Sequence, residues 1–271
     1  MALFFEILYM RIALIVEYDG SQYHGWQAQN GLNTVQGTLE TALSQIANEE
    51  IKVVCAGRTD TGVHGTNQVI HFDCDKERTV RAWIYGANSF LPKDICVRWG
   101  KEMPETFHAR YSASSRRYRY IIHNTPIRSA LLRSNVTWQY RQLDHRLMHK
   151  AAQLLIGEHD FTSFRSIECQ SKTPMRSVLQ ISVQRKLDFV IIDITANAFL
   201  HHMVRNIAGV LMAVGCARHP VEWVKEVLEA KDRKLGAETA PPYGLYLVSV
   251  AYPSEFGMVE QFSESLFFDL S

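Results

Sequence analysis

The chain has 271 residues, of which 46% are hydrophobic and 21% are charged, with a formal net charge of +1 at pH 7. This length and composition are typical of a soluble globular protein with one large or two smaller domains, and no apolar stretch is long enough to span a membrane. The five cysteines, at positions 55, 74, 96, 169 and 216, form no Cys-x-x-Cys pair. We therefore expect reduced thiols in a cytoplasmic protein and no structural zinc site.

The small net charge hides a strongly basic segment. Residues 105–150 contain nine Lys or Arg and two acidic residues, whereas residues 252–271 contain four acidic residues and no basic one. Phosphate contacts depend on the local field, so a nearly neutral protein with one basic segment can bind a polyanion. A solvated face would carry the same arginines, and the charge pattern alone does not choose between the two interpretations.

The apolar periodicity of the first half predicts the order strand, helix, strand, strand, helix, strand. Strands are expected at residues 11–18, 51–55, 66–73 and 95–99, and helices at residues 34–47 and 80–90. Asn33 and Gln36 resemble a capping box at the start of the first helix. The order is that of the split βαβ arrangement in ferredoxin-like folds.

The second half repeats this order with insertions. Strands are expected at residues 116–123, 136–140, 178–184, 189–196 and 245–251, and helices at residues 145–156 and 202–213 and after Pro220. Asp144 is a good N-cap and Gly157 a good C-cap for the first of these helices. The predicted fold is α+β, with two ferredoxin-like halves whose mixed or antiparallel sheets lie side by side and leave a central cleft. The predicted domains are an N-terminal extension (1–9), an N-terminal half (10–104), a C-terminal half (105–252) and a tail (253–271).

A polar loop at residues 57–65 separates two of the expected strands. It contains nine residues, three of them glycine, and it carries Arg58, Asp60 and His64. A glycine-rich turn in which Asp60 caps local backbone would explain this composition. Long loops without structure of their own are usually functional, which is the second interpretation.

The sequence Gly57-Arg-Thr-Asp-Thr-Gly-Val-His64 resembles the catalytic motif of the TruA family of tRNA pseudouridine synthases. Residues 18–27, 160–164 and 240–247 resemble further motifs of this family, in the family's order, so that the resemblance covers roughly residues 10–252. It implies that the chain isomerises uridine to pseudouridine at tRNA positions 38, 39 and 40, in the anticodon stem-loop. It also implies a homodimer. The apolar segment 262–270 is a candidate for contacts between subunits.

The resemblance also implies roles for individual residues. Asp60 would be the catalytic carboxylate, and Arg205 its ion-pair partner. Arg205 lies in an otherwise apolar segment, one turn from Gly209, where the missing side chain lets another backbone come close. On the residues alone, Arg205 needs a carboxylate partner because a buried arginine is costly unless paired, and a purely structural ion pair would satisfy it.

Tyr118 matches a family tyrosine that stacks on the target base. Period two places Arg116 and Tyr118 on one face of their strand and Arg117 and Arg119 on the other. On the residues alone, Tyr118 is a core tyrosine with a satisfied hydroxyl. The resemblance further implies substrate contacts for Arg58, His64, Arg116, Arg119 and Leu245.

The chemistry of the isomerisation needs no cofactor and no metal, because no redox change occurs. The carboxylate must be ionised, either to attack or to stabilise positive charge at C1′, and a neighbouring arginine favours that form. The target base must leave its stack, which calls for a replacement stacking surface such as Tyr118, and Tyr118 is also a candidate base for the C5 proton. Attack at C6 and attack at C1′ both remain open.

Two other classes of protein fit parts of the sequence. A non-catalytic RNA-binding protein would need the basic segment and Tyr118 but not Asp60. A metal-dependent hydrolase would use Asp60, His64, His71 and Asp73, which show no recognised ligand spacing. His201 and His202 are expected to point different ways, so no two-histidine metal site is predicted.

Overall fold

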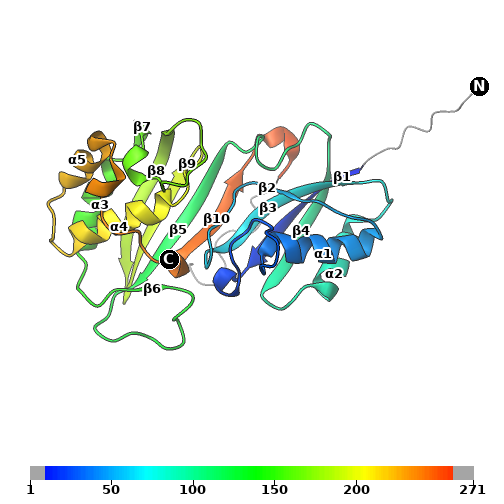
Figure 1. Cartoon of the computed structure of the whole chain (residues 1–271), viewed down its shortest axis with the longest axis horizontal. Coiled ribbons are helices and arrows are strands. Elements are labelled where there is room, and N and C mark those ends of the chain that lie inside the picture. The colour runs from blue at the N-terminus through cyan, green and yellow to red at the C-terminus, as the bar shows by residue number, and fades with distance from the viewer. Residues whose placement is uncertain (1–9, 259–271) are drawn as a thin grey trace, which may run out of the picture. The chain divides into compact units, whose positions relative to one another are not determined.

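The computed structural model describes residues 10–258 (Figure 1). The chain forms two compact units, and among the described residues one unit comprises 10–114 and 250–258 and the other 115–249. The expected domain limits stay a prediction. The expected extension 1–9, and the apolar segment 262–270 of the expected tail, lie outside the described residues.

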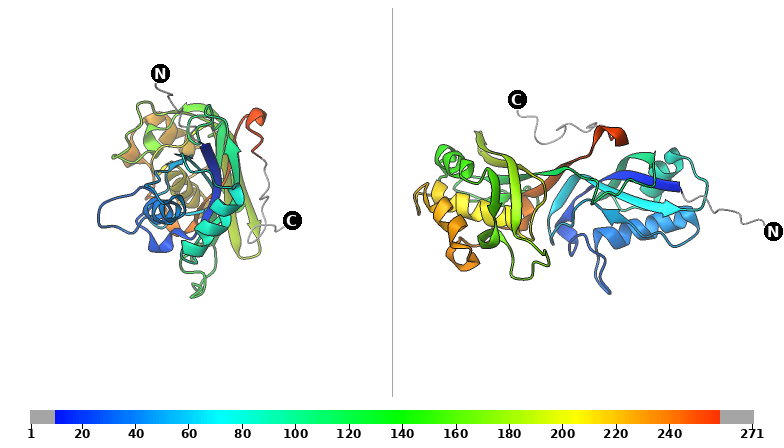
Figure 2. Two further views of the ribbon diagram at one scale, coloured as in Figure 1. Left: turned by 90° about the vertical axis from the view of Figure 1, so that its right-hand side faces the viewer. Right: turned by 90° about the horizontal axis from the view of Figure 1, so that it is seen from above.

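The first unit is an antiparallel sheet covered by two helices. Its elements are β1 (Met10–Tyr18), α1 (Val35–Ala47), β2 (Val54–Cys55), β3 (His64–Cys74), α2 (Val80–Phe90) and β4 (Ile95–Met103). β1 pairs with both β3 and β4, and β2 pairs with β3, so the strand order is β4-β1-β3-β2. α1 runs along one face of this sheet (Figures 1 and 2). Apolar residues of both helices and of the strands form one core, in which Trp83 of α2 packs edge to face on Phe72 of β3.

The second unit has the same central order with additions. Its elements are β5 (Ser115–His123), β6 (Thr137–Trp138), α3 (His145–Gln153), β7 (Gly157–Asp160), β8 (Met175–Lys186), β9 (Phe189–Ala196), α4 (Met203–Gly215), α5 (Trp223–Ala230) and β10 (Leu245–Ala251). The strand order is β10-β5-β9-β8-β7. β9 pairs antiparallel with β5 and with β8, whereas the short β6 pairs parallel with β5.

The predicted α+β class is confirmed. The order β4-β1-β3-β2 of the first unit corresponds to β10-β5-β9-β8 in the second, and this is the ferredoxin-like order. In the described part of the chain, no helix combines the length and the apolar character needed to cross a membrane.

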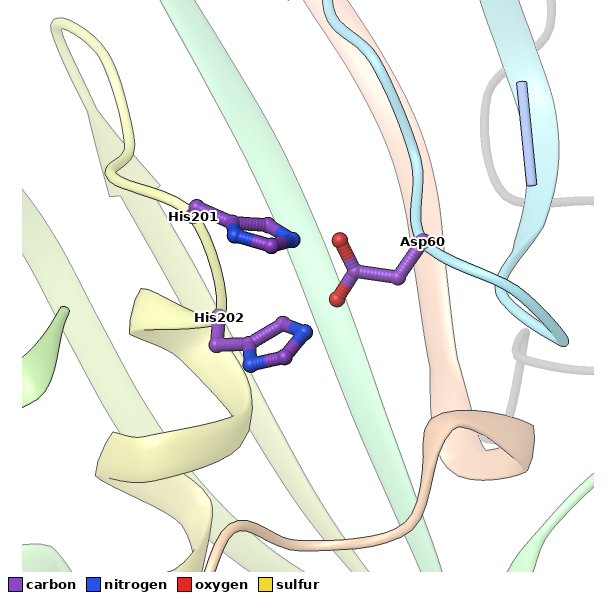
Figure 3. A group of neighbouring side chains, drawn as sticks. All are labelled: Asp60, His201 and His202. Atoms are coloured by element: carbon purple, nitrogen blue, oxygen red, sulfur yellow. The ribbon is translucent and has the colours of Figure 1, made fainter. Parts of the chain in front are cut away.

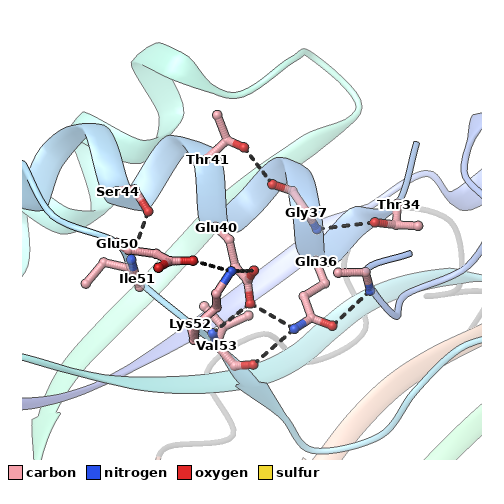
Figure 4. A network of polar contacts seen from close by, with 11 residues as sticks. Thr34, Gln36, Gly37, Glu40, Thr41, Ser44, Glu50, Ile51, Lys52 and Val53 are labelled. Carbon is pink, nitrogen blue, oxygen red and sulfur yellow. Dashed lines mark hydrogen bonds and ion pairs between the residues drawn. The ribbon is translucent and has the colours of Figure 1, made fainter. Parts of the chain in front are cut away.

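The expected strand at residues 51–55 is wrong in length, because the strand itself is only Val54–Cys55. Side chains of α1 bind the backbone just before it (Figure 4). Glu40 accepts a hydrogen bond from the Val53 amide at 3.0 Å, and Ser44 accepts one from the Ile51 amide at 2.9 Å. The helix therefore satisfies backbone groups that a longer ladder would have paired.

Two predicted helix caps are also wrong. Thr34, not Asn33, is the N-cap of α1, and its hydroxyl accepts a hydrogen bond from the Gly37 amide. α3 ends at Gln153, and Gly157, with φ of +104°, opens β7, a strand that was not predicted. Asp144 is confirmed as the N-cap of α3, where it accepts hydrogen bonds from the amides of the second and third helical residues.

Candidate active site

The Asp60 loop, defined as residues 56–63, joins β2 to β3. It is shorter than predicted, because His64 and Gly65 already belong to β3. The Val63 amide donates to the Asp60 carbonyl at 3.1 Å and closes a turn in which Gly62 has φ of +78°. A positive φ at this position suits glycine, which has no Cβ to clash with the following carbonyl. The turn thus fixes the backbone that carries Asp60.

The three loop residues ahead of this turn differ in exposure. Thr59 is buried, Asp60 is half-buried and Arg58 is exposed. The carboxylate therefore has some shelter from water, while the guanidinium on the same loop is available to solvent. Exposure to solvent thus rises from Thr59 through Asp60 to Arg58.

Hydrogen bonds from outside the Asp60 loop hold its first half. The Tyr18 hydroxyl lies 2.8 Å from Thr59 Oγ1, and the Trp26 amide donates to the Thr59 carbonyl at 3.0 Å. The side-chain amide of Gln68, on β3, donates through Nε2 to the Gly57 carbonyl at 2.6 Å. No sequence pattern predicts these supports, because Tyr18 and Thr59 are 41 positions apart in the chain.

The supporting segment, residues 19–26, packs against the Asp60 loop so closely that two of its residues must be glycine. A Cβ on Gly20 would lie 1.9 Å from the Val63 carbonyl oxygen, and a Cβ on Gly25 would lie 2.9 Å from the Thr59 carbonyl oxygen. Gly25 also has φ of +84°. These glycines are the sequence signal that marks the supporting segment.

His64, predicted to contact substrate, is 1% exposed at the start of β3. Its Nδ1 accepts a hydrogen bond from the Gly20 amide at 3.1 Å and lies at the same distance from an Asp19 carboxylate oxygen. The ring therefore ties β3 to the supporting segment within the first unit. Its predicted contact with RNA stays a prediction.

In the second unit, Tyr118 lies on β5 and is 7% exposed. Its ring packs edge to face on Phe199, with the ring centroids 5.0 Å apart. Arg116, on the same face, donates to the Asn197 carbonyl at 3.0 Å. An aromatic pair of this kind orients the Tyr118 ring.

Arg117 and Arg119 bind the same carboxylate, that of Asp193 on β9. Arg117 does so with two hydrogen bonds, at 2.7 and 2.8 Å, and Arg119 donates through Nε at 2.6 Å. The prediction that these two arginines share a face is confirmed. Two of the arginines of the basic segment are thus paired with a carboxylate within the second unit. The predicted RNA contact of Arg119 stays a prediction.

Arg205 and Leu245 lie near the start of α4 and of β10. The Arg205 guanidinium donates through Nε to the Ala240 carbonyl at 2.9 Å, which orients it, and Leu245 is 5% exposed. The expected close approach at Gly209 is confirmed, because a Cβ there would lie 2.1 Å from the Glu238 carbonyl oxygen. The backbone that orients Arg205 is therefore packed tightly on α4.

The two histidines ahead of α4 do not point different ways, so that expectation is wrong. The rings of His201 and His202 lie side by side, with centroids 4.1 Å apart (Figure 3). His202 is the N-cap of α4 and has φ of +64°, in the left-handed region. This backbone conformation turns the second ring toward the first. Figure 3 also shows Asp60 on its loop.

Two residues of the hydrolase interpretation, His71 and Asp73, bind other groups within the first unit. His71 Nδ1 accepts from the Ala109 amide at 3.1 Å, and burial lowers the pKa of His71 to about 4. Both oxygens of Asp73 accept hydrogen bonds from Arg11, at 2.7 Å. A ligand set of Asp60, His64, His71 and Asp73 is not supported by this geometry.

Comparison with known proteins assigns the family. The family model described as tRNA pseudouridine synthase matches residues 14–112 and 151–253. The tRNA pseudouridine synthase A of Legionella pneumophila (strain Lens) is 73% identical over 258 residues, which cover 95% of this chain and 98% of that protein. The protein of the same name from Pseudoalteromonas atlantica is 58% identical over 249 residues, with 92% and 95% covered.

Among solved structures, that of a Cbf5-Nop10-Gar1 complex matches 87% of this chain and 57% of its own, with 11% identity and a TM-score of 0.33. A similarity this low adds nothing to the assignment, which rests on the sequence matches. The family model covers both units, and the relatives match over nearly their whole length. The chain therefore belongs to the tRNA pseudouridine synthase family, in the group named tRNA pseudouridine synthase A.

Proposed function

We propose that this tRNA pseudouridine synthase acts on uridines of the anticodon stem-loop, at tRNA positions 38, 39 and 40, with Asp60 as its catalytic carboxylate. The observation that carries the proposal is the Asp60 loop. It has the sequence of the TruA catalytic motif, and hydrogen bonds hold its backbone on both sides of Asp60, at Thr59 and at Val63. A reacting carboxylate needs a fixed position of this kind.

The isomerisation breaks the bond between ribose C1′ and uracil N1 and forms a bond between C1′ and C5. N1 gains a proton and C5 loses one, so atoms and charge balance without a redox partner. Ionised Asp60 attacks the nucleotide or stabilises positive charge at C1′. The family resemblance supports Arg205 as the cation that favours the ionised carboxylate.

Tyr118 is the proposed stacking surface for the base that has left its stack, and the proposed acceptor or relay for the C5 proton. Its support is the edge-to-face contact with Phe199, which holds the ring in place. Arg58 is proposed to fill the space that the base leaves or to hold a phosphate, because its side chain is exposed beside Asp60.

Recognition of the RNA is proposed to rest on its shape and backbone. Three neighbouring targets for one site favour shape over base sequence, and residues 105–150 carry the basic charge that phosphate contacts need. The family resemblance supports a homodimer in which one RNA touches both subunits.

The test is tritium release from tRNA labelled at uridine C5, in the presence of chelator. We expect release by the intact protein and none above background by Asp60→Asn or Asp60→Ala. Asp73→Asn is the matched control, because Asp73 lies on the same unit but binds Arg11 rather than belonging to the loop. It should retain full activity.

A second set of substrates tests the position. Replacing the uridines at 38, 39 and 40 by cytidine should abolish release, whereas replacing uridines elsewhere should not. Release by Asp60→Asn would overturn the proposed role of Asp60. Release that persists without the three uridines would overturn the proposed site on the tRNA.

A further inference from the structure

The residue just before Asp60, Thr59, is held by contacts of both its main chain and its side chain. Thr59 is 7% exposed, and its carbonyl accepts from the Trp26 amide at 3.0 Å. Its hydroxyl lies 2.8 Å from the hydroxyl of Tyr18, which is 2% exposed. Both the main chain and the side chain of Thr59 are therefore bound, directly before the proposed catalytic residue.

Tyr18 is itself fixed by the sheet. It ends β1, the strand between β3 and β4, and pairs with Gly65 on one side and Ile95 on the other. Its ring covers Gly65, where a Cβ would lie 2.7 Å from the ring carbon Cε1. The ring also packs on Trp26, with centroids 5.7 Å apart. The hydroxyl thus has a position that the core of the first unit determines.

A buried hydroxyl that loses its partner is costly, so each of the two hydroxyls holds the other in place. The pair holds Thr59 in place relative to the sheet, and Thr59 in turn holds the adjacent Cα of Asp60. A displacement of a reacting group by about 1 Å costs on the order of 100-fold in rate. The pair is therefore well placed to control rate without touching substrate.

We propose that Tyr18 and Thr59 are positioning residues that fix the Asp60 carboxylate for the isomerisation through their hydroxyl pair. The inference rests on the proposed role of Asp60 in catalysis. It predicts that loss of either hydroxyl lowers kcat and leaves tRNA binding almost unchanged, because neither side chain is exposed to RNA.

The experiment is a series of kcat and KM measurements by tritium release. Tyr18→Phe and Thr59→Val each remove one hydroxyl with little change of shape, and we expect kcat to fall about tenfold with KM within about twofold of the parent. Thr59→Ser keeps the hydroxyl and should restore most of kcat. The double variant Tyr18→Phe/Thr59→Val should be no slower than the worse single variant, because both changes remove the same bond.

Tyr252→Phe is the matched control. Tyr252 also lies in the first unit, and its hydroxyl donates to the Ala109 carbonyl at 2.6 Å, outside the Asp60 loop. We expect it to lower the melting temperature as much as Tyr18→Phe does, with kcat unchanged. An equal loss of kcat in both variants would reduce the effect of Tyr18 to general destabilisation and overturn the proposal.

Asp60→Asn belongs to the same series and separates the two proposals. Activity in Asp60→Asn would refute the proposed function. An inactive Asp60→Asn together with full kcat in folded Tyr18→Phe and Thr59→Val would overturn the positioning role alone. If Tyr18→Phe does not fold, the contrast between Thr59→Val and Thr59→Ser decides, and equal kcat values for these two would overturn the proposal.

Discussion

The two units differ at one equivalent connection, between the second and third strands of the ferredoxin-like order. In the first unit this is the Asp60 loop, residues 56–63, which follows a strand of only two residues, Val54–Cys55. In the second unit it is the turn Leu187–Asp188, and beyond a register shift near Val178 the ladder of β8 and β9 runs without a break up to the pair Lys186 and Phe189. The two units have the same strand order, but at this connection the first has a long loop and the second a two-residue turn.

The two connections are held in place by different contacts. The β8–β9 turn is held by its own ladder and has an exposed side chain, Leu187, at its tip. The ladder that leads into the Asp60 loop is short, with only the pairs Val54–His71 and Cys55–Ile70. Bonds from Tyr18, Trp26, Gln68 and the side chains of α1 add to it. The proposed catalytic residue thus lies on a loop whose position is set by contacts from the rest of the unit.

The largest effect is expected from filling the closest contact of the Asp60 loop. In Gly20→Ala the new Cβ would meet the Val63 carbonyl oxygen at 1.9 Å, so the loop must move away from the supporting segment. We expect the free energy of unfolding to fall by about 3 kcal/mol and kcat to fall at least tenfold. Urea denaturation and tritium release measure the two quantities.

The second unit supplies the control for this change. At Gly236 the nearest atom to a new Cβ is an Arg233 side-chain nitrogen at 3.4 Å, which is ordinary contact. Gly236→Ala should change neither stability by more than about 0.5 kcal/mol nor kcat. If Gly20→Ala likewise changes neither quantity, the close packing of segment 19–26 on the Asp60 loop is needed neither for stability nor for catalysis.

A smaller effect is expected from changing Glu40, whose buried carboxylate binds the backbone just before β2. Glu40→Ala leaves the Val53 amide and the Gln36 side chain without the acceptor that now lies 3.0 and 2.8 Å away. Leaving buried donors unpaired should cost about 2 kcal/mol and increase hydrogen exchange at residues 51–58. Glu40→Gln keeps an acceptor for the Val53 amide and should lose much less, and equal losses would show that charge rather than this bond is important.

The elements that the sequence predicted well are those in which local signals and tertiary packing agree. α2 was predicted with its observed limits, because Thr79 caps its start and Pro92 follows its end. β2 was predicted too long because Glu40 and Gln36, distant in sequence, bind Val53. β7 was missed because its residues 157–160 are polar apart from a glycine, and pairing with β8 alone makes them a strand.

The same contrast applies to the candidate site. The motif around Asp60 is continuous in sequence, so resemblance to a family was enough to select it. The residues that hold it are not continuous with it. Tyr18 reaches Thr59 only because β1 lies beside β3, and no pattern in the sequence states this register. Gly20 and Gly25 are the one local sign of the close packing, and glycine is so common in turns that the sign is ambiguous.

The far end of β3 should contribute to stability and not to activity. A hydrogen bond from Arg11 holds the pKa of Asp73 below its ordinary value. Because the folded pKa is depressed, the stabilisation is complete above the unfolded pKa of about 3.9 and is lost as the pH falls through the folded pKa. In Asp73→Asn the melting temperature should fall less steeply below about pH 4. The free energy of unfolding that the pair contributes at neutral pH should be less than about 1 kcal/mol, because the pair is exposed. A change in kcat at neutral pH would contradict the separation of scaffold and loop.

The smallest effect, and the sharpest test of the comparison, is expected at the tip of the β8–β9 turn. Leu187 has φ of +52° and is 86% exposed, so it keeps a strained backbone without burying its side chain. Leu187→Gly removes a cost of about 1 kcal/mol but adds freedom to the unfolded chain, so we expect a net gain of about 0.5 kcal/mol. kcat and KM should not change, because this turn has no proposed role in the reaction. A rise in KM would show that the turn Leu187–Asp188 also binds RNA. Both connections would then have a function, and they would differ only in length.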